Sequence, residues 1–152
     1  MRLLLLAGLT LLSACAAKQI PGTQIADTRD SRAILEVMER YRAALEAKDS
    51  KRILSLVSKN FRDDAGTDSP EDDLRYSDLP AQLDARLAQL SDLKLELNIR
   101  KVTVVEKEAA AIYYWNASFR MPKLSGKNQN EAELEQMLFE KVDGDWKIVS
   151  GI

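Results

Sequence analysis

The hydrophobic residues of this 152-residue chain change their spacing once, and that change restricts the fold more than any other feature. Between about residues 31 and 90 they recur every three to four positions, as on one face of an amphipathic helix. From about residue 91 onward they alternate with polar residues, as in strands that bury one face. This order predicts an α+β domain in which three N-terminal helices pack on a curved, mainly antiparallel sheet.

The helical part divides into three predicted helices. The first begins near Asp30, and the second, shorter one follows a capping residue, Asp49. The polar stretch over residues 62–73 indicates a loop. The third helix starts near Asp78 and has Pro80 in its first turn, where proline is tolerated.

The first predicted strand contains a change of phase. Its apolar residues stand at odd positions from Leu93 to Ile99 and at even positions at Val102 and Val104. A one-residue slip within a strand is typical of a β-bulge, so we expect a bulge near Arg100 that bends the sheet. Further strands are predicted at residues 109–121, 131–142 and 146–152.

The N-terminal segment resembles a bacterial lipoprotein signal peptide. Arg2 precedes the apolar run Leu3–Leu12, which is shorter than the roughly 20 residues of a membrane-spanning helix. The run ends in Leu12-Ser13-Ala14-Cys15, which is similar to a lipobox, and Cys15 is the only cysteine of the chain. An ordinary signal peptide with an unrelated cysteine is the alternative.

The lipobox resemblance implies cleavage before Cys15, a thioether lipid on its sulfur and acylation of its new amino group. Two or more acyl chains anchor a protein stably to a membrane. Ala16 rather than Asp follows the cysteine, which by resemblance to enterobacterial sorting favours the outer membrane. We therefore expect a signal peptide over residues 1–14, a lipidated Cys15 with a flexible tether over residues 15–30, and a folded domain over residues 31–152.

Composition limits the chemistry that the domain can perform. The chain has no histidine, so the commonest general base and metal ligand are missing. A net charge of −2 argues against binding to nucleic acid. The acidic residues between Asp63 and Asp73 lack the spacing of a helix–loop–helix calcium site, and they indicate a solvated loop. We expect neither a metal nor a cofactor.

Two segments together resemble the nuclear transport factor 2-like superfamily, also described as cystatin-like cone folds. The first runs from Tyr41 to Asp49 and continues through Ile53–Val57 to Phe61, and the second is Leu138–Gly151. They are similar to the first helix pair and the terminal hairpin of that superfamily. The resemblance implies a pocket between the concave face of the sheet and the helices. Its members include ketosteroid isomerases, scytalone dehydratase, polyketide cyclases and non-catalytic transport and scaffold domains.

The resemblance to the isomerases implies an acid–base site. In those enzymes a tyrosine of the first helix donates a hydrogen bond to the substrate oxygen and a carboxylate abstracts a proton. Tyr41 matches the position of that tyrosine, and Asp64 or its neighbour Asp63 lies near the position of the base. No acidic residue stands between Ala109 and Met121 to act as a second donor. Tyr41 also belongs to the apolar stripe of its helix, so packing in the core is the alternative.

Aromatic residues offer a candidate pocket wall. Tyr113, Trp115 and Phe119 share one face of a predicted strand, and Tyr76 precedes the third helix. Together with Tyr41 they would suit a flat apolar molecule. The alternative is an ordinary core between sheet and helices.

Three functions therefore stay open. The first is a non-enzymatic envelope lipoprotein whose cone binds a small apolar ligand or a protein partner. The second is an acid–base enzyme of the isomerase, dehydratase or cyclase type that uses Tyr41 with Asp64 or Asp63. The third is a structural subunit of an envelope complex. The opposite face of the second strand, around Tyr114, could be solvated or could form a homodimer contact.

Overall fold

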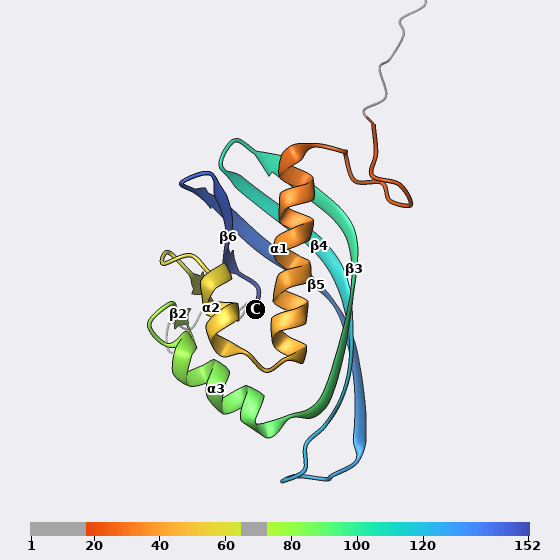
Figure 1. Ribbon diagram of the computed structural model, residues 1–152, viewed down its shortest axis with the longest axis vertical. Coiled ribbons are helices and arrows are strands. Elements are labelled where there is room, and N and C mark those ends of the chain that lie inside the picture. Colours follow the sequence, from red (N-terminus) through yellow and green to blue (C-terminus); the bar gives the residue numbers. More distant parts are fainter. Residues whose placement is uncertain (1–17, 65–72) are drawn as a thin grey trace, which may run out of the picture.

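The computed structural model describes residues 18–64 and 73–152 (Figure 1). The predicted signal peptide and lipid site lie outside these residues. The described elements are, in chain order, α1 (Arg29–Glu46), α2 (Ser50–Leu56), β1 (Arg62–Asp63), β2 (Leu74–Arg75), α3 (Leu79–Gln89), β3 (Ser91–Val105), β4 (Glu108–Arg120), β5 (Asn128–Val142) and β6 (Asp145–Ser150). The predicted α+β class, with three helices packed on a curved antiparallel sheet, is confirmed.

The first two helices begin where short polar side chains cap them. Thr28 accepts a hydrogen bond from the Ser31 backbone at the start of α1, and Asp49 does the same for α2. Pro80 lies in the first turn of α3, as predicted. Within the described residues, none of the helices is both long enough and apolar enough to cross a membrane.

The segment before α1 is folded in its described part. The sequence suggested a flexible tether over residues 15–30, but Arg29 and Asp30 already belong to α1. Residues 18–28 form a turn closed by a bridge between Gln19 and Ala26. Ile25, inside this turn, is only 2% exposed.

The main sheet has the order β3-β4-β5-β6 with antiparallel neighbours throughout. Ile99 pairs with Tyr113, and Lys101 pairs with the next residue back along β4, Ile112, so the register shifts at Arg100. The predicted β-bulge is therefore confirmed. A second shift near the start of β3 and the two-stranded β1–β2 sheet were not predicted, because such short features leave no hydrophobic period.

The curved sheet partly encloses α1, which lies along its concave side, while α2 lies beside α1 and α3 lies beside α2 (Figure 1). The core forms between the helices and the concave face. Its largest fully buried side chains are Ile34, Met38, Ile53, Met137, Phe139 and Ile148.

Asp30 fastens the start of α1 to the β5–β6 hairpin. Its Oδ1 atom accepts hydrogen bonds from Lys141 Nζ at 2.5 Å and from Trp146 Nε1 at 3.0 Å. These bonds hold the pKa of Asp30 below its usual value, and the bond from Lys141 has the largest effect. The helix and the terminal hairpin are therefore joined at the end of the domain where α1 begins.

Candidate functional site

A cavity of about 810 Å³ lies inside the curve of the sheet, between α1, α3 and the inner faces of β3, β4 and β5. Leucines of α1 and β3, the leucine that follows α3 and aromatic residues of β4 form much of its wall, among them Leu45, Leu90, Leu93, Leu97, Trp115 and Phe119. The volume lies within the roughly 300–1,000 Å³ range of small-molecule sites. The core therefore does not fill the inside of the cone.

Tyr41 presents an available hydroxyl group to this cavity. The residue is 7% exposed and lines the cavity from α1. Its hydroxyl has no hydrogen-bond partner among the described residues. In that part of the chain, every fully buried side-chain oxygen or nitrogen does have a partner, so the Tyr41 hydroxyl is not fully buried. The small exposed fraction of Tyr41 therefore includes the hydroxyl, which reaches the cavity space.

The ionisation of Tyr41 and Tyr113 is suppressed. Burial, reinforced by nearby Tyr113 and opposed by Arg86, raises the pKa of Tyr41 well above its usual value. Burial and the Glu135 carboxylate raise the pKa of Tyr113 to about 12. Both phenols are thus hydrogen-bond donors at neutral pH, but the Tyr113 hydroxyl already lies 3.4 Å from the Gly151 carbonyl oxygen.

The two candidate carboxylates lie in different surroundings. Asp63 lines the cavity from β1, and its Oδ2 atom accepts a hydrogen bond of 2.8 Å from the Gly151 backbone nitrogen. Asp64 is exposed and is not part of the cavity wall. Tyr41 and Asp63 therefore share one cavity, and Asp64 does not.

Some of the aromatic candidates line the cavity and one does not. Tyr113, Trp115 and Phe119 all line the cavity from β4. Tyr76 is half-buried outside its wall, where the Lys59 ammonium group lies 5.8 Å from the centre of its ring.

The sequence reasoning missed the charged part of the wall. Arg86 of α3 and Glu131 and Glu135 of β5 line the cavity. The glutamates could have been found from their spacing, because they share the odd positions of the buried Met137 and Phe139.

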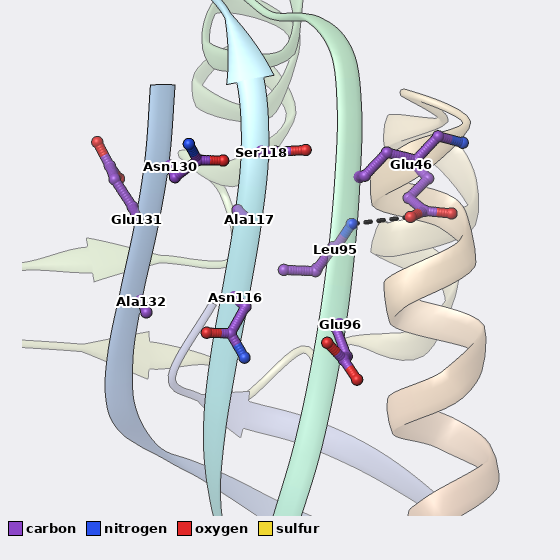
Figure 2. A pocket seen from close by; sticks show the side chains of 10 residues that line it. Glu46, Leu95, Glu96, Asn116, Ala117, Ser118, Asn130, Glu131 and Ala132 are labelled. Atoms are coloured by element: carbon purple, nitrogen blue, oxygen red, sulfur yellow. Dashed lines mark hydrogen bonds between the residues drawn. The ribbon is translucent and has the colours of Figure 1, made fainter. Parts of the chain in front are cut away.

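A second hollow, of about 490 Å³, crosses β3, β4 and β5 (Figure 2). Polar side chains such as Glu96, Asn116 and Asn130 line it. Beside it, Glu46 of α1 accepts a hydrogen bond of 2.8 Å from the Leu95 backbone nitrogen, which lowers the pKa of Glu46 (Figure 2). This contact ties α1 to the free edge of β3.

The acidic loop is only partly described. Asp68, Glu71 and Asp72 lie outside the described residues, whereas Asp73 pairs with Arg62 at 2.7 Å. Within residues 18–64 and 73–152, no group of three acidic, histidine or cysteine side chains is placed to hold a metal ion.

No family model and no curated protein match the sequence. Solved structures do match. A protein of the nuclear transport factor 2-like superfamily from Salmonella enterica serovar Typhimurium has a TM-score of 0.64 and 18% identity, covering 80% of this chain and 89% of that one. A provisionally assigned dehydratase of the same family from Streptomyces avermitilis has a TM-score of 0.64 and 15% identity, covering 80% and 93%.

A provisionally assigned ketosteroid isomerase from Shewanella frigidimarina has a TM-score of 0.64 and 19% identity, covering 84% of this chain and 96% of that one. At such identities the likeness concerns the fold. The chain has the nuclear transport factor 2-like, cystatin-like fold.

Proposed function

We propose that this protein binds a small, largely apolar molecule in the cavity of its cone. The observation behind the proposal is the Tyr41 hydroxyl, which faces an apolar cavity of about 810 Å³ without a partner among the described residues. A polar group in such surroundings is stabilised when a ligand supplies its hydrogen bond. The apolar wall would contribute affinity and Tyr41 would orient the ligand.

Removal of single hydroxyl groups tests this proposal. Pyrenemethanol, a flat apolar alcohol, is titrated into the purified full chain by equilibrium dialysis against a protein-free blank. Tyr41→Phe should weaken its binding about 2- to 10-fold, because one hydrogen bond is lost. Tyr113→Phe is the matched control, since that hydroxyl already faces the Gly151 carbonyl oxygen. Absence of binding to the unmodified chain would refute the proposal.

A second candidate function is acid–base catalysis. Its support is that Asp63 and Tyr41 line the same cavity, and that two solved structures of this fold have provisional enzyme assignments. Asp63 would take a proton from the carbon next to a carbonyl group, and the Tyr41 hydroxyl would donate a hydrogen bond to the carbonyl oxygen.

Deuterium exchange at the carbon next to the carbonyl group tests the catalytic hypothesis. A cyclic ketone is incubated with the chain in D₂O and followed by NMR, with Asp63→Asn and Asp64→Asn compared side by side. Catalysed exchange that Asp63→Asn abolishes and Asp64→Asn retains would support the enzyme. Exchange no faster than in buffer would refute the catalytic function and leave ligand binding as the proposed function.

We also propose that the domain is held at the cell envelope by a lipid on Cys15, at the outer membrane rather than the inner one. The support is the lipobox-like Leu12-Ser13-Ala14-Cys15. Cys15→Ser should move the protein from the membrane fraction to the soluble fraction, and Ser13→Ala, which keeps a small residue, should not. Retention of the Cys15→Ser protein in membranes would contradict the anchor.

A further inference from the structure

One half of β5 has its polarity reversed. Toward its C-terminal end, Met137 and Phe139 point inward and are buried, as expected for a strand on a core. Side chains alternate along a strand, so Glu131, Glu133 and Glu135 occupy the same inward row. Outward-facing Leu134 is 50% exposed. In the row of glutamates, Glu135 is half-buried and Glu131 and Glu133 are exposed. A strand with carboxylates on its concave face and a leucine on its outer face reverses the usual polarity, and such conflicts are expected at functional or strained sites.

The inward carboxylates stand directly across from aromatic side chains. In the β4–β5 register, Glu135 pairs with Tyr113 and Glu133 with Trp115. Directly opposite residues of an antiparallel pair have Cβ atoms roughly 4.5–5.5 Å apart. Of these residues, Tyr113, Trp115 and Glu135 line the cavity and Glu133 does not. The cavity therefore has aromatic side chains beside the Glu135 carboxylate, a combination that attracts organic cations through ring quadrupoles and ion pairing.

The charges at the cavity are unbalanced. Its wall includes three carboxylates, those of Asp63, Glu131 and Glu135, against one guanidinium, that of Arg86. Among the described residues, neither glutamate of β5 takes part in an ion pair. The two are four positions apart on an extended strand, roughly 13 Å, which is too far for one metal ion to bind both.

The Tyr41 hydroxyl gives independent support for a ligand at this place. It belongs to a residue more than nine-tenths buried, it faces the same cavity, and it has no partner in the part of the chain that the structure describes. The carboxylates indicate the charge of the ligand, and the Tyr41 hydroxyl offers it a hydrogen bond.

We propose that the cavity selects a flat apolar molecule bearing a protonated amine, with the amine held at Glu135, the apolar body against Trp115, and Glu131 adding negative charge to the same wall. This inference rests on the proposed binding function and adds the charge of the ligand. Edge strands also use charged residues to prevent association, and β6 pairs only with the C-terminal part of β5. Charges on either face of β5 would protect its free edge from association. The three glutamates all lie on the concave face, so edge protection alone does not explain their placement.

The test compares three probes with one apolar body: pyrenemethylamine, pyrenemethanol and pyrenecarboxylate. Equilibrium dialysis with the full chain measures each affinity at low and at high ionic strength. The amine should bind about 5- to 10-fold more tightly than the alcohol at low salt, through ion pairing and contact with the aromatic rings. The carboxylate should bind most weakly, and the advantage of the amine should shrink in about 1 M salt.

Variants locate the selectivity. Glu131→Gln combined with Glu135→Gln should bring the amine and alcohol affinities together, and Glu131→Gln alone should remove part of the difference. Unchanged alcohol affinity shows that the variants are folded. The matched control is Glu96→Gln, which removes a carboxylate from β3 between the inward-facing Leu95 and Leu97 and so from the outer face.

The outcomes separate this inference from the proposed function. Equal affinities for amine and alcohol in the unmodified chain, or tighter binding of the carboxylate, would overturn the charge selectivity and leave the binding function standing. Loss of selectivity in Glu96→Gln as well would overturn the assignment to β5. Absence of binding by all three probes would overturn both proposals.

Discussion

Gly151 offers a prediction with an internal control. Its φ angle is +89°, and a Cβ atom added there would lie 2.9 Å from the Met137 Cα atom and closer still to the Gln136 carbonyl oxygen. Gly144 has a similar φ angle, +94°, but a Cβ atom there meets nothing within 4 Å. Alanine at both positions therefore incurs the same kind of backbone strain, and only Gly151→Ala adds a collision with backbone atoms.

The expected losses follow from these surroundings. Positive φ costs an L-residue about 1–2 kcal/mol, which is the whole effect expected for Gly144→Ala. Relief of the collision at Gly151 requires a shift of its backbone, and we expect this shift to break the hydrogen bond from its nitrogen to Asp63. A hydrogen bond to a charged group contributes about 1.5–3 kcal/mol. Gly151→Ala should therefore lower the free energy of unfolding by about 2.5–5 kcal/mol.

Urea unfolding followed by tryptophan fluorescence measures both variants, with the slope against denaturant as a check that the transition stays two-state. Gly151→Ala should also weaken pyrenemethanol binding, because Gly151 lines the cavity. The reasoning fails if Gly151→Ala loses no more stability than Gly144→Ala.

Three further predictions concern other parts of the domain. The pKa of Asp30 is lowered on folding. Its contribution to stability is therefore present above the unfolded pKa of about 3.9 and is lost as the pH falls through the lower folded pKa. Urea unfolding at several pH values should show that the stability of Asp30→Asn falls less at acid pH than that of the unmodified chain. Met137→Ala should lower the unfolding free energy by about 2–5 kcal/mol in the same assay, because Met137 is fully buried, and a smaller loss would mean that the core collapses around it. If the outer face around Tyr114 forms a homodimer, Leu134→Arg, across the strand pair from Tyr114, should give a monomer in sedimentation velocity, and an unchanged dimer would rule that face out.

The elements with a long hydrophobic period could be predicted from the sequence. The shift from odd to even positions after Ile99 located the bulge, because burial of one face ties side-chain parity to backbone register. The start of β5 was misplaced: the strand begins at Asn128 instead of residue 131, since polar residues there pair through their backbone without a hydrophobic signal.

The site was less predictable because it depends on contacts between distant segments. Asp63 belongs to a two-residue strand, and it reaches the cavity wall beside Gly151, far along the chain. Nothing local distinguishes it from the exposed Asp64. Glu131 and Glu135 appear in the sequence as ordinary strand charges, and only the parity of Met137 reveals that they point inward.

The bulge also suggests how a hollow domain of this kind could be lost or resized. Without Arg100, the apolar residues of β3 would alternate without interruption from Leu93 through Val104, which describes a straighter strand. A straighter β3 would curve less around α1, so a sequence with a more regular pattern would enclose less space. Gain or loss of one residue at the bulge in β3 would thus change the volume of the cavity while every side chain of its wall is retained. Short insertions and deletions in β3 are therefore as informative as substitutions when variants of this domain are compared.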